Sequence, residues 1–172
     1  GGKMKTKIIK IYEYKELSDK AKENVLNSFR NNNQFDFLSD DLIECLKAFL
    51  ETEKIRVIDK LQICYSLTNS QGDGLSFTGI FEWKKYKIYI TRKNVHYSHK
   101  RTTDIIIEDK NSEQISNESI DNKFRNIYFS ICDKLEKIGY ESIDNENSEE
   151  TIKENIKINE YTFRENGEME NE

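Results

Sequence analysis

Two glycines flank an aspartate in the segment 70–77, which reads SQGDGLSF. Glycine adopts backbone conformations that other residues avoid, so the chain either turns tightly here or lets a ligand approach closely. The segment lacks the lysine of a phosphate-binding P-loop and the third glycine of a dinucleotide-binding turn, and it leads into an expected strand. A hairpin connection is the main interpretation. The alternative is a binding loop in which Gln71 and Asp73 contact a ligand or partner.

The segment 83–103 contains no aspartate or glutamate, and its lysines and arginines alternate with aromatic residues. Cations neutralise phosphates and aromatic rings stack on bases, so this composition is typical of a nucleic-acid contact. The same residues fit a sheet with one buried aromatic face and one face of solvated lysines, and an acidic protein surface would also satisfy them. Besides Gln71 and Asp73, the predicted partner-binding residues are Lys84, Lys85, Lys87, Arg92, Lys93, Lys100 and Arg101.

The two histidines of the chain, His96 and His99, also lie in this basic segment. Two imidazoles supply half of a metal site, and the surrounding positive charge repels a cation, so neither a metal nor a cofactor is expected. The three cysteines are far apart in sequence and have apolar neighbours, which favours buried thiols over a disulfide framework. A third hypothesis is an enzyme that uses Gln71, Asp73 and a histidine, since one sequence does not reveal which residues meet in space.

The formal net charge of -5 conceals two halves of opposite sign. Residues 1–103 carry 19 lysines and arginines against 13 acidic residues, whereas residues 104–172 carry 8 against 19. This polarity either orients encounter with a charged partner or reflects complementary charges on elements that pack together. An ordered acidic surface at 141–172 would also imitate a nucleic-acid backbone, although such a run is more often a solvated face or tail.

Length and composition predict a single α+β domain over residues 3–165, followed by a disordered acidic tail at 166–172. Hydrophobic residues make up 35% of the 172 and aromatic residues 11%, so the core must be compact and rich in aromatic rings. We expect Gly1 and Gly2 to be a cloning remnant. No apolar run is long enough to span a bilayer and the first residues lack a signal peptide, so we expect a cytoplasmic protein without a membrane partner.

The spacing of apolar residues predicts three main helices. Apolar side chains recur every three or four residues after the N-cap residues Ser18 and Ser39, which predicts helices at about 19–31 and 40–52. A longer helix is expected at 118–138, with Gly139 as its C-terminal cap. The acidic segment 144–158 fits a shorter fourth helix.

Runs rich in β-branched and aromatic residues predict the strands. They lie at 8–14, 55–58, 61–67, 75–83, 86–90, 103–108 and 160–164. Short polar connections join the central ones, so we expect them to pair as an antiparallel meander. The predicted fold class is α+β, with a mostly antiparallel sheet of five to seven strands packed against about three helices on one face.

Three segments suggest a relationship to known proteins: 11–22 (IYEYKELSDKAK), 70–77 (SQGDGLSF) and 158–167 (INEYTFRENG). Together they resemble the landmarks of a family of small phage-encoded proteins, some of which are labelled antitoxins of toxin–antitoxin systems. Those relatives usually have an aromatic, glycine-bearing segment before the glycine string, where this chain has residues 64–67 (CYSL). The family offers no catalytic residues to carry over. The resemblance implies an accessory gene of a phage or mobile element, and such genes often act on host defence.

These observations predict a non-enzymatic protein of a phage or mobile element that binds a host protein or ribonucleoprotein complex. It would inhibit a host defence nuclease, as anti-CRISPR proteins do, by contacting its target through basic residues 84–101 or through the acidic end. The alternative is an antitoxin-like regulatory protein that binds nucleic acid through the same basic strands. The identity of the target and the oligomeric state are left open by the sequence.

Overall fold

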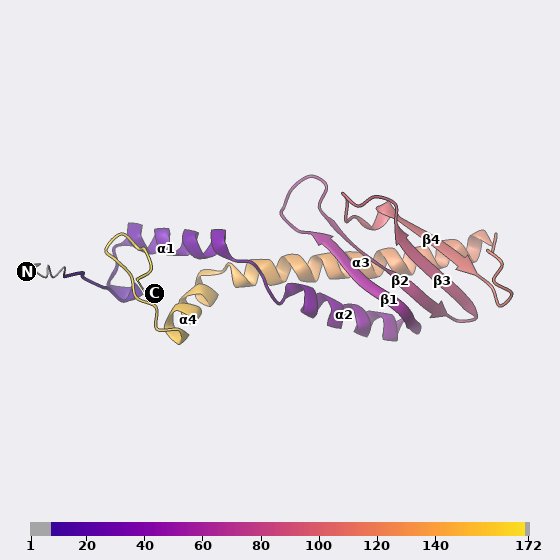
Figure 1. Ribbon diagram of the computed structural model, residues 1–172, viewed down its shortest axis with the longest axis horizontal. Coiled ribbons are helices and arrows are strands. Elements are labelled where there is room, and N and C mark those ends of the chain that lie inside the picture. Colours follow the sequence, from indigo (N-terminus) through magenta and orange to yellow (C-terminus); the bar gives the residue numbers. More distant parts are fainter. Residues whose placement is uncertain (1–7, 171–172) are drawn as a thin grey trace, which may run out of the picture. The chain divides into compact units, whose positions relative to one another are not determined.

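The computed structural model describes residues 8–170, which form two compact units (Figure 1). Unit 1 combines the N-terminal part up to residue 35 with the C-terminal part from residue 143, and unit 2 is residues 36–142. The single domain over 3–165 stays a prediction. No helix in the described part of the chain has the length and apolar character needed to cross a membrane.

Unit 2 is built on a four-stranded antiparallel sheet with the strand order β1-β2-β3-β4. The strands are β1 (Ile55–Ser66), β2 (Gly74–Trp83), β3 (Tyr86–Arg92) and β4 (Thr103–Glu108). Successive side chains of a strand point to opposite faces, and in β3 and β4 the alternate isoleucines Ile88, Ile90, Ile105 and Ile107 are all buried. The sheet therefore has one face committed to the core.

The helices α2 (Leu38–Thr52) and α3 (Glu118–Glu146) cover this buried face. The rings of Phe77 and Tyr128 lie 4.6 Å apart between β2 and α3, and those of Trp83 and Phe124 lie 5.3 Å apart. Tilted aromatic pairs of this kind add about 0.5–1.5 kcal/mol beyond the area that they bury. The aromatic-rich core expected from the composition is thus the contact between α3 and the sheet.

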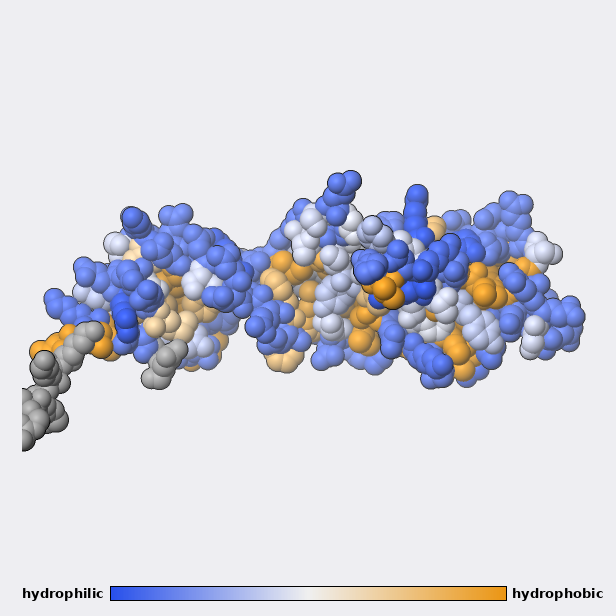
Figure 2. Space-filling model, turned by 45° about the horizontal axis from the view of Figure 1, so that its top comes forward, coloured by the Kyte–Doolittle hydropathy of each residue, from blue (hydrophilic) through white to orange (hydrophobic). Residues whose placement is uncertain are grey.

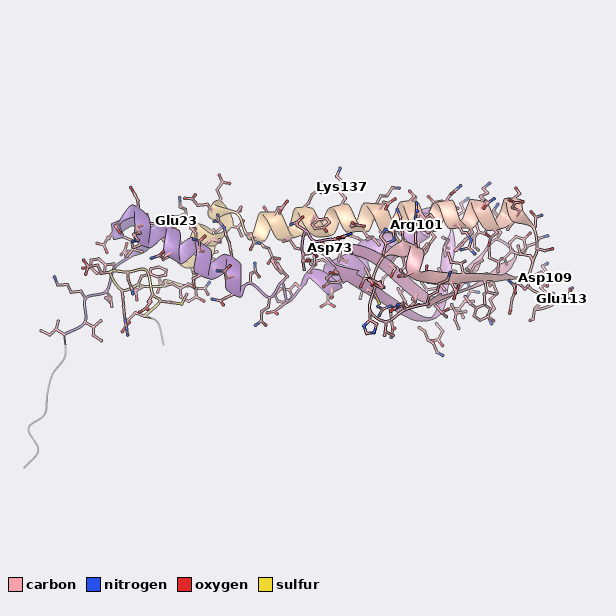
Figure 3. The ribbon with its side chains drawn as sticks, turned by 90° about the horizontal axis from the view of Figure 1, so that it is seen from above. Glu23, Asp73, Arg101, Asp109, Glu113 and Lys137 are labelled. Atoms are coloured by element: carbon pink, nitrogen blue, oxygen red, sulfur yellow. The ribbon has the colours of Figure 1, made fainter. Side chains whose placement is uncertain are left out.

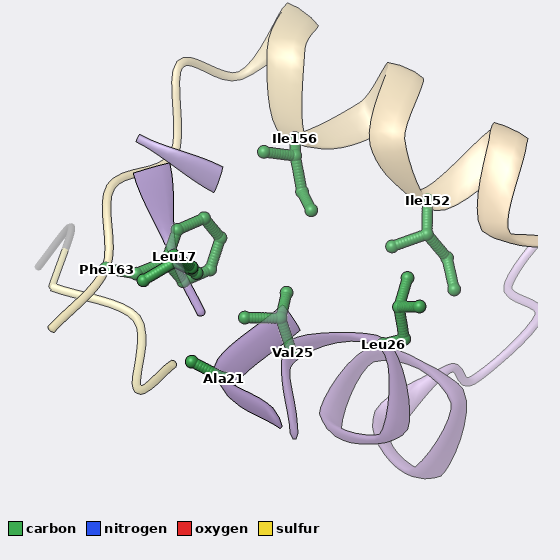
Figure 4. Packing of buried hydrophobic residues seen from close by; sticks show 7 residues of the cluster. All are labelled: Leu17, Ala21, Val25, Leu26, Ile152, Ile156 and Phe163. Atoms are coloured by element: carbon green, nitrogen blue, oxygen red, sulfur yellow. The ribbon is translucent and has the colours of Figure 1, made fainter. Parts of the chain in front are cut away.

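Unit 1 packs α1 (Asp19–Asn32) against α4 (Glu149–Ile158), with the short 3-10 helix η1 (Tyr14–Glu16) beside them. Each of the two α-helices begins at a serine whose hydroxyl accepts a backbone hydrogen bond, Ser18 from Ala21 and Ser148 from Thr151. The core residues of the unit come from both ends of the chain (Figure 4): Leu17, Ala21, Val25, Leu26, Ile152, Ile156 and Phe163. The core of unit 1 is thus shared between the two ends of the chain.

The α+β class and the antiparallel sheet are confirmed, but the described residues form four strands and not the expected five to seven. The segments 55–58 and 61–67 belong to one strand, β1, whose pairing with β2 shifts register around Lys60 at a φ of 58°. The expected end strands at 8–14 and 160–164 meet only in the isolated bridge between Tyr12 and Phe163. A single bridge fixes the two segments without creating a fifth strand.

Three further expectations differ from the structure. The second helix begins at Leu38, before the predicted N-cap Ser39, whose hydroxyl lies 2.7 Å from the Tyr65 phenol oxygen. The long helix does not stop at Gly139 but continues to Glu146, because this glycine makes room for Leu67: a Cβ there would lie 2.4 Å from Leu67 Cδ1. Residues 166–170 of the segment expected to be a tail fold back, and Met169 forms a bridge with Phe163. Residues 171–172 of that tail lie outside the described part.

Candidate functional site

The loop between β1 and β2 is organised around the carboxylate of Asp73. It accepts hydrogen bonds from the backbone amides of Thr68 at 2.7 Å and Ser70 at 3.2 Å. The hydroxyls of Ser66, Thr68 and Ser70 lie 3.0–3.2 Å from its other oxygen. The phenol of Tyr140, on α3, donates to the same carboxylate. Asp73 therefore holds the loop together and ties it to the helix (Figure 3).

These donors change the ionisation of both partners. The hydrogen bond from Tyr140, supported by those from Thr68, Ser70 and Ser66, holds the pKa of Asp73 well below its usual range. The same bond raises the pKa of the Tyr140 phenol to about 12. At neutral pH the pair is consequently a charged acceptor and a neutral donor, which is the stable combination.

We expect Asp73→Asn to destabilise unit 2 at neutral pH and to lower the pKa of Tyr140 towards about 10, its ordinary value. Folding lowers the pKa of Asp73. The carboxylate therefore contributes its full stabilisation of the folded state above about pH 4, its pKa in the unfolded chain, and this stabilisation is lost as the pH falls further. The raised pKa of Tyr140 predicts a second loss of stability as the pH rises from about 10 to about 12.

Urea unfolding of wild type and Asp73→Asn at pH 7 and pH 3 tests this expectation, with the Tyr140 pKa followed by NMR. The exposed Asp36→Asn is the control for loss of one carboxylate. An unfolding difference between wild type and Asp73→Asn that is the same at both pH values would contradict the proposed role of the carboxylate.

Gln71 and His99, the histidine nearest the loop between β1 and β2, lie beside different glycines. Gln71 is exposed in the turn before Gly72, whose φ is 97°. His99 lies against Gly74, where a Cβ would come within 2.8 Å of the His99 Cα. The His99 ring accepts a hydrogen bond from the Arg101 amide, 3.1 Å from its Nδ1. The described hydrogen bonds thus give Asp73 and His99 structural partners.

The predicted basic residues are not brought together. Lys84 and Lys85 form the turn between β2 and β3, with Lys84 at a φ of 56°. Lys93 and the pair Lys100 and Arg101 follow the other end of β3, whose seven residues span about 20 Å. The two groups therefore lie at opposite ends of β3.

Several of these cations also have partners within unit 2. The Lys100 ammonium pairs with Asp133 and lies over the Phe129 ring, and Lys93 pairs with Asp104 at 3.1 Å. The Arg92 guanidinium donates to two carbonyls of the 93–99 loop, those of Val95 and Tyr97. Exposed ion pairs are weak, but they reduce the positive field that a phosphate backbone would meet.

The remaining three lysines lie over aromatic rings: Lys84 over Trp83 at 4.6 Å, Lys85 over Tyr86 at 5.5 Å and Lys87 over Tyr89 at 5.1 Å. A cavity of about 470 Å³ opens at the hairpin turn, lined by Trp83, Lys84, Lys85, Tyr86, Ser119, Ile120 and Lys123. Its three cations and two rings are the feature that best suits the nucleic-acid alternative.

No cluster of His, Cys, Asp and Glu suited to a metal ion occurs in residues 8–170. All three cysteines are free. The predicted burial is confirmed for Cys132, whereas Cys45 and Cys64 are only half-buried. Burial raises the pKa of the Cys132 thiol to about 12, so this group stays protonated at neutral pH.

A larger cavity, of about 1120 Å³, lies in unit 1 between α1, α4 and η1. We call it the unit 1 groove. Its apolar lining includes Tyr14, Leu26, Ile156 and Tyr161, and its polar lining includes Thr162. Its charged lining has both signs: Lys15, Lys22, Lys153 and Lys157 with Glu13, Asp19, Glu23, Glu149 and Glu160.

Two ion pairs order the edges of the groove. Lys15 meets Glu13 at 2.7 Å and Lys153 meets Glu149 at 2.5 Å, while the Lys153 ammonium lies 5.9 Å from the Tyr14 ring centroid. Partial burial raises the pKa of the Tyr14 phenol despite the nearby lysine. The groove therefore offers aromatic and aliphatic surface between charges that already hold defined positions.

Sequence reasoning identified the acidic end as a possible surface but missed the groove, because its lining comes from both ends of the chain. A signal for this assembly exists: residues 1–35 carry eight lysines and arginines against four acidic residues, and residues 143–172 carry three against ten. Unit 1 therefore combines one segment of net positive charge with one segment of net negative charge.

No protein-family model, curated protein or solved structure matches this chain. The class of protein is therefore defined by its described architecture, an α+β fold with a four-stranded antiparallel sheet and four α-helices. The resemblance to small phage-encoded proteins stays a prediction.

Proposed function

We propose that this protein is a non-enzymatic effector that binds a segment of a target protein in the unit 1 groove. The observation that carries this proposal is the groove itself, with its apolar surface and its charges of both signs. Its volume of about 1120 Å³ exceeds the range of about 300–1,000 Å³ that is typical of small-molecule sites. A peptide segment with apolar anchors and flanking charges suits this space.

The charges of the groove favour a protein over a nucleic acid. Five of its lining residues are carboxylates, and these would repel a phosphate backbone that the four lysines attract. A protein segment carries both acidic and basic side chains, which can pair with the lysines and the carboxylates of the groove. The dispersed positions of the predicted basic residues support the same choice.

The kind of target follows from the sequence resemblance. If the chain is an accessory protein of a phage or mobile element, the bound segment belongs to a host defence nuclease complex, and binding inhibits that complex as anti-CRISPR proteins do. The antitoxin-like alternative uses the cations around the Trp83–Tyr86 turn to bind nucleic acid. The two proposals place the contact on different units, so one set of variants separates them.

Affinity capture from host cells that express defence nuclease complexes tests the proposal. We expect the wild type to recover a nuclease or guide complex and to inhibit its cleavage of nucleic acid. Lys22→Glu combined with Lys157→Glu reverses two charges of the groove. Acidic side chains of the bound segment would then face like charges, so capture should weaken at least about tenfold.

The matched control is Lys20→Glu combined with Lys137→Glu, which makes the same charge change at exposed helix positions outside the groove lining. Equal capture by both double variants would exclude the groove as the contact. Recovery of no defence protein, together with binding of DNA or RNA at low salt, would replace this proposal with the nucleic-acid alternative.

A further inference from the structure

One face of the sheet in unit 2 carries a row of alternating charges. Arg56 on β1 lies directly opposite Glu82 on β2 in the strand register. Glu82 in turn lies opposite Lys87 on β3, and Lys87 lies opposite Glu108 on β4. Directly paired residues point to the same face, and this face is opposite the one that α2 and α3 cover. From β1 to β4 the order of charge is plus, minus, plus, minus.

The residues of this row are accessible and ordered. Arg56 and Glu82 form an ion pair at 2.6 Å while keeping 67% and 47% of their side chains exposed. Lys87 is also exposed, and Glu108 is half-exposed. We call this surface, with its neighbouring rows, the open sheet face.

A second row, two residues along the strands, is largely apolar. Ile80 pairs with Tyr89 and Tyr89 with Ile106, while Asp59 ends the row on β1. Ile106 is 40% exposed, and Ile80 and Tyr89 are only partly buried. Figure 2 shows that apolar patches interrupt a largely hydrophilic surface on the face in view. Covering such apolar surface with another sheet lowers the free energy, because the surface is removed from water.

We propose that the open sheet face binds the same face of a second copy of this chain. The charge row is self-complementary: read backwards, plus-minus-plus-minus becomes minus-plus-minus-plus. A two-fold axis parallel to the strands, between β2 and β3, places Arg56 opposite Glu108 of the second copy. The same operation places Glu82 opposite Lys87 of the second copy, so every charge in the row meets its opposite.

The apolar row obeys the same symmetry. The axis leaves each row at its own height along the strands, so Ile80 faces Tyr89 of the second copy in the middle of the interface. At the two edges Ile106 faces Asp59 of the second copy. Two sheets that pack in this aligned manner lie about 10 Å apart, with an angle of about -30° from their twist.

Other face-to-face arrangements are less favourable. A two-fold axis in the plane of the interface but perpendicular to the strands, through the charged row, would set Arg56 against Arg56 and Glu82 against Glu82. Like charges in direct opposition destabilise a contact between strands or subunits. The row therefore selects both the partner, a second copy, and the orientation of the pair.

Sedimentation velocity over about a hundredfold range of protein concentration tests the dimer, because self-association responds to concentration by mass action. We expect a reversible dimer that weakens as salt screens the opposed charges. Lys87→Glu opposes Glu82 of the second copy with a like charge and should raise the dimer Kd at least about tenfold. Lys85→Glu is the control, since Lys85 has the same charge but lies in the hairpin turn over the Tyr86 ring.

A variant with all four charges inverted gives the most specific result. Arg56→Glu, Glu82→Arg, Lys87→Glu and Glu108→Lys together keep the alternation, so this protein should dimerise about as well as the wild type. It should not pair with the wild type, because inverted and original rows oppose like charges. A variant without any charge change serves if the inverted protein does not fold. Ile80→Thr keeps a β-branched residue but removes apolar surface that faces Tyr89 of the second copy, so it should weaken the dimer.

Three results would overturn the proposal: a wild type that stays monomeric throughout the concentration range, Lys85→Glu and Lys87→Glu variants that dimerise equally, or mixed dimers of wild type and inverted protein as abundant as the pure ones. The groove variants of unit 1 alter none of these residues. Loss of target capture and loss of dimerisation are therefore separate outcomes.

Discussion

Tyr128→Phe is expected to lower the free energy of unfolding by about 2–6 kcal/mol, although it removes one oxygen atom. The pairing of β2 with β3 ends at Gly79 and Ile90, so Phe77 lies beyond the last pair of that ladder. The Tyr128 hydroxyl takes up both backbone groups of Phe77: it donates to the carbonyl at 3.0 Å and lies 3.3 Å from the amide nitrogen. A phenylalanine leaves two buried polar groups without these partners.

The environment of the hydroxyl explains the size of this effect. Tyr128 is fully buried, and burial raises the pKa of its phenol, so the group is a neutral donor and acceptor across the physiological range. Water cannot replace it without opening the contact between α3 and the sheet. Each unsatisfied buried group costs about 1–3 kcal/mol, which sets the expected range.

Urea denaturation followed by circular dichroism measures the change. Tyr97→Phe is the control, because Tyr97 is 52% exposed and the same loss of a hydroxyl there should change the stability by no more than about 0.5 kcal/mol. If the two variants are equally stable, the hydroxyl of Tyr128 does not complete the backbone bonding of β2.

Gly167→Ala is expected to destabilise unit 1 by about 2–4 kcal/mol through backbone strain and a steric clash. Gly167 has a φ of 92°, and a Cβ there would lie 2.5 Å from the Ala21 carbonyl oxygen and 3.2 Å from Val25 Cγ2. The obstacle is the backbone of α1, which cannot move as the end of a flexible side chain can. The C-terminal segment would have to leave α1, and with it Tyr161 and Thr162 of the groove lining.

Gly72→Ala is the matched control because Gly72 has a similar φ of 97° but nothing within 4 Å of a Cβ. It should cost about 1 kcal/mol from strain alone. Hydrogen exchange measured by mass spectrometry should show lost protection of residues 159–170 in Gly167→Ala and unchanged protection there in Gly72→Ala. Equal effects of the two substitutions would mean that the close approach to α1 is not required.

Local sequence signals determined most elements of this protein. Ser18 followed by apolar residues at helical spacing predicts a helix at 19–31, and the structure has 19–32. The strand predicted at 103–108 has the observed bounds of β4, since three isoleucines and alternation define it locally. Where both the start and the period of an element lie within a few residues, the sequence alone suffices.

The same reasoning failed where a residue serves a distant contact. Gly139 has the composition of a helix cap, yet it lies inside α3 because Leu67 occupies the space beside it. The predicted strand at 8–14 pairs only through Tyr12, since its partner Phe163 is about 150 residues away and also bridges Met169. A local pattern states the preference of a segment but does not name the segment that it packs against.

The sequence by itself determined the α+β class, the main helices, the central strands and the two opposite charges of the chain. Only the tertiary structure decided how they combine: a basic and an acidic terminus form one groove, and scattered basic residues separate to the two ends of a sheet. It also decided that Arg56, Glu82, Lys87 and Glu108 form one row. The physical reason is that pairing and packing depend on residues far apart in sequence, whose proximity no local spacing encodes.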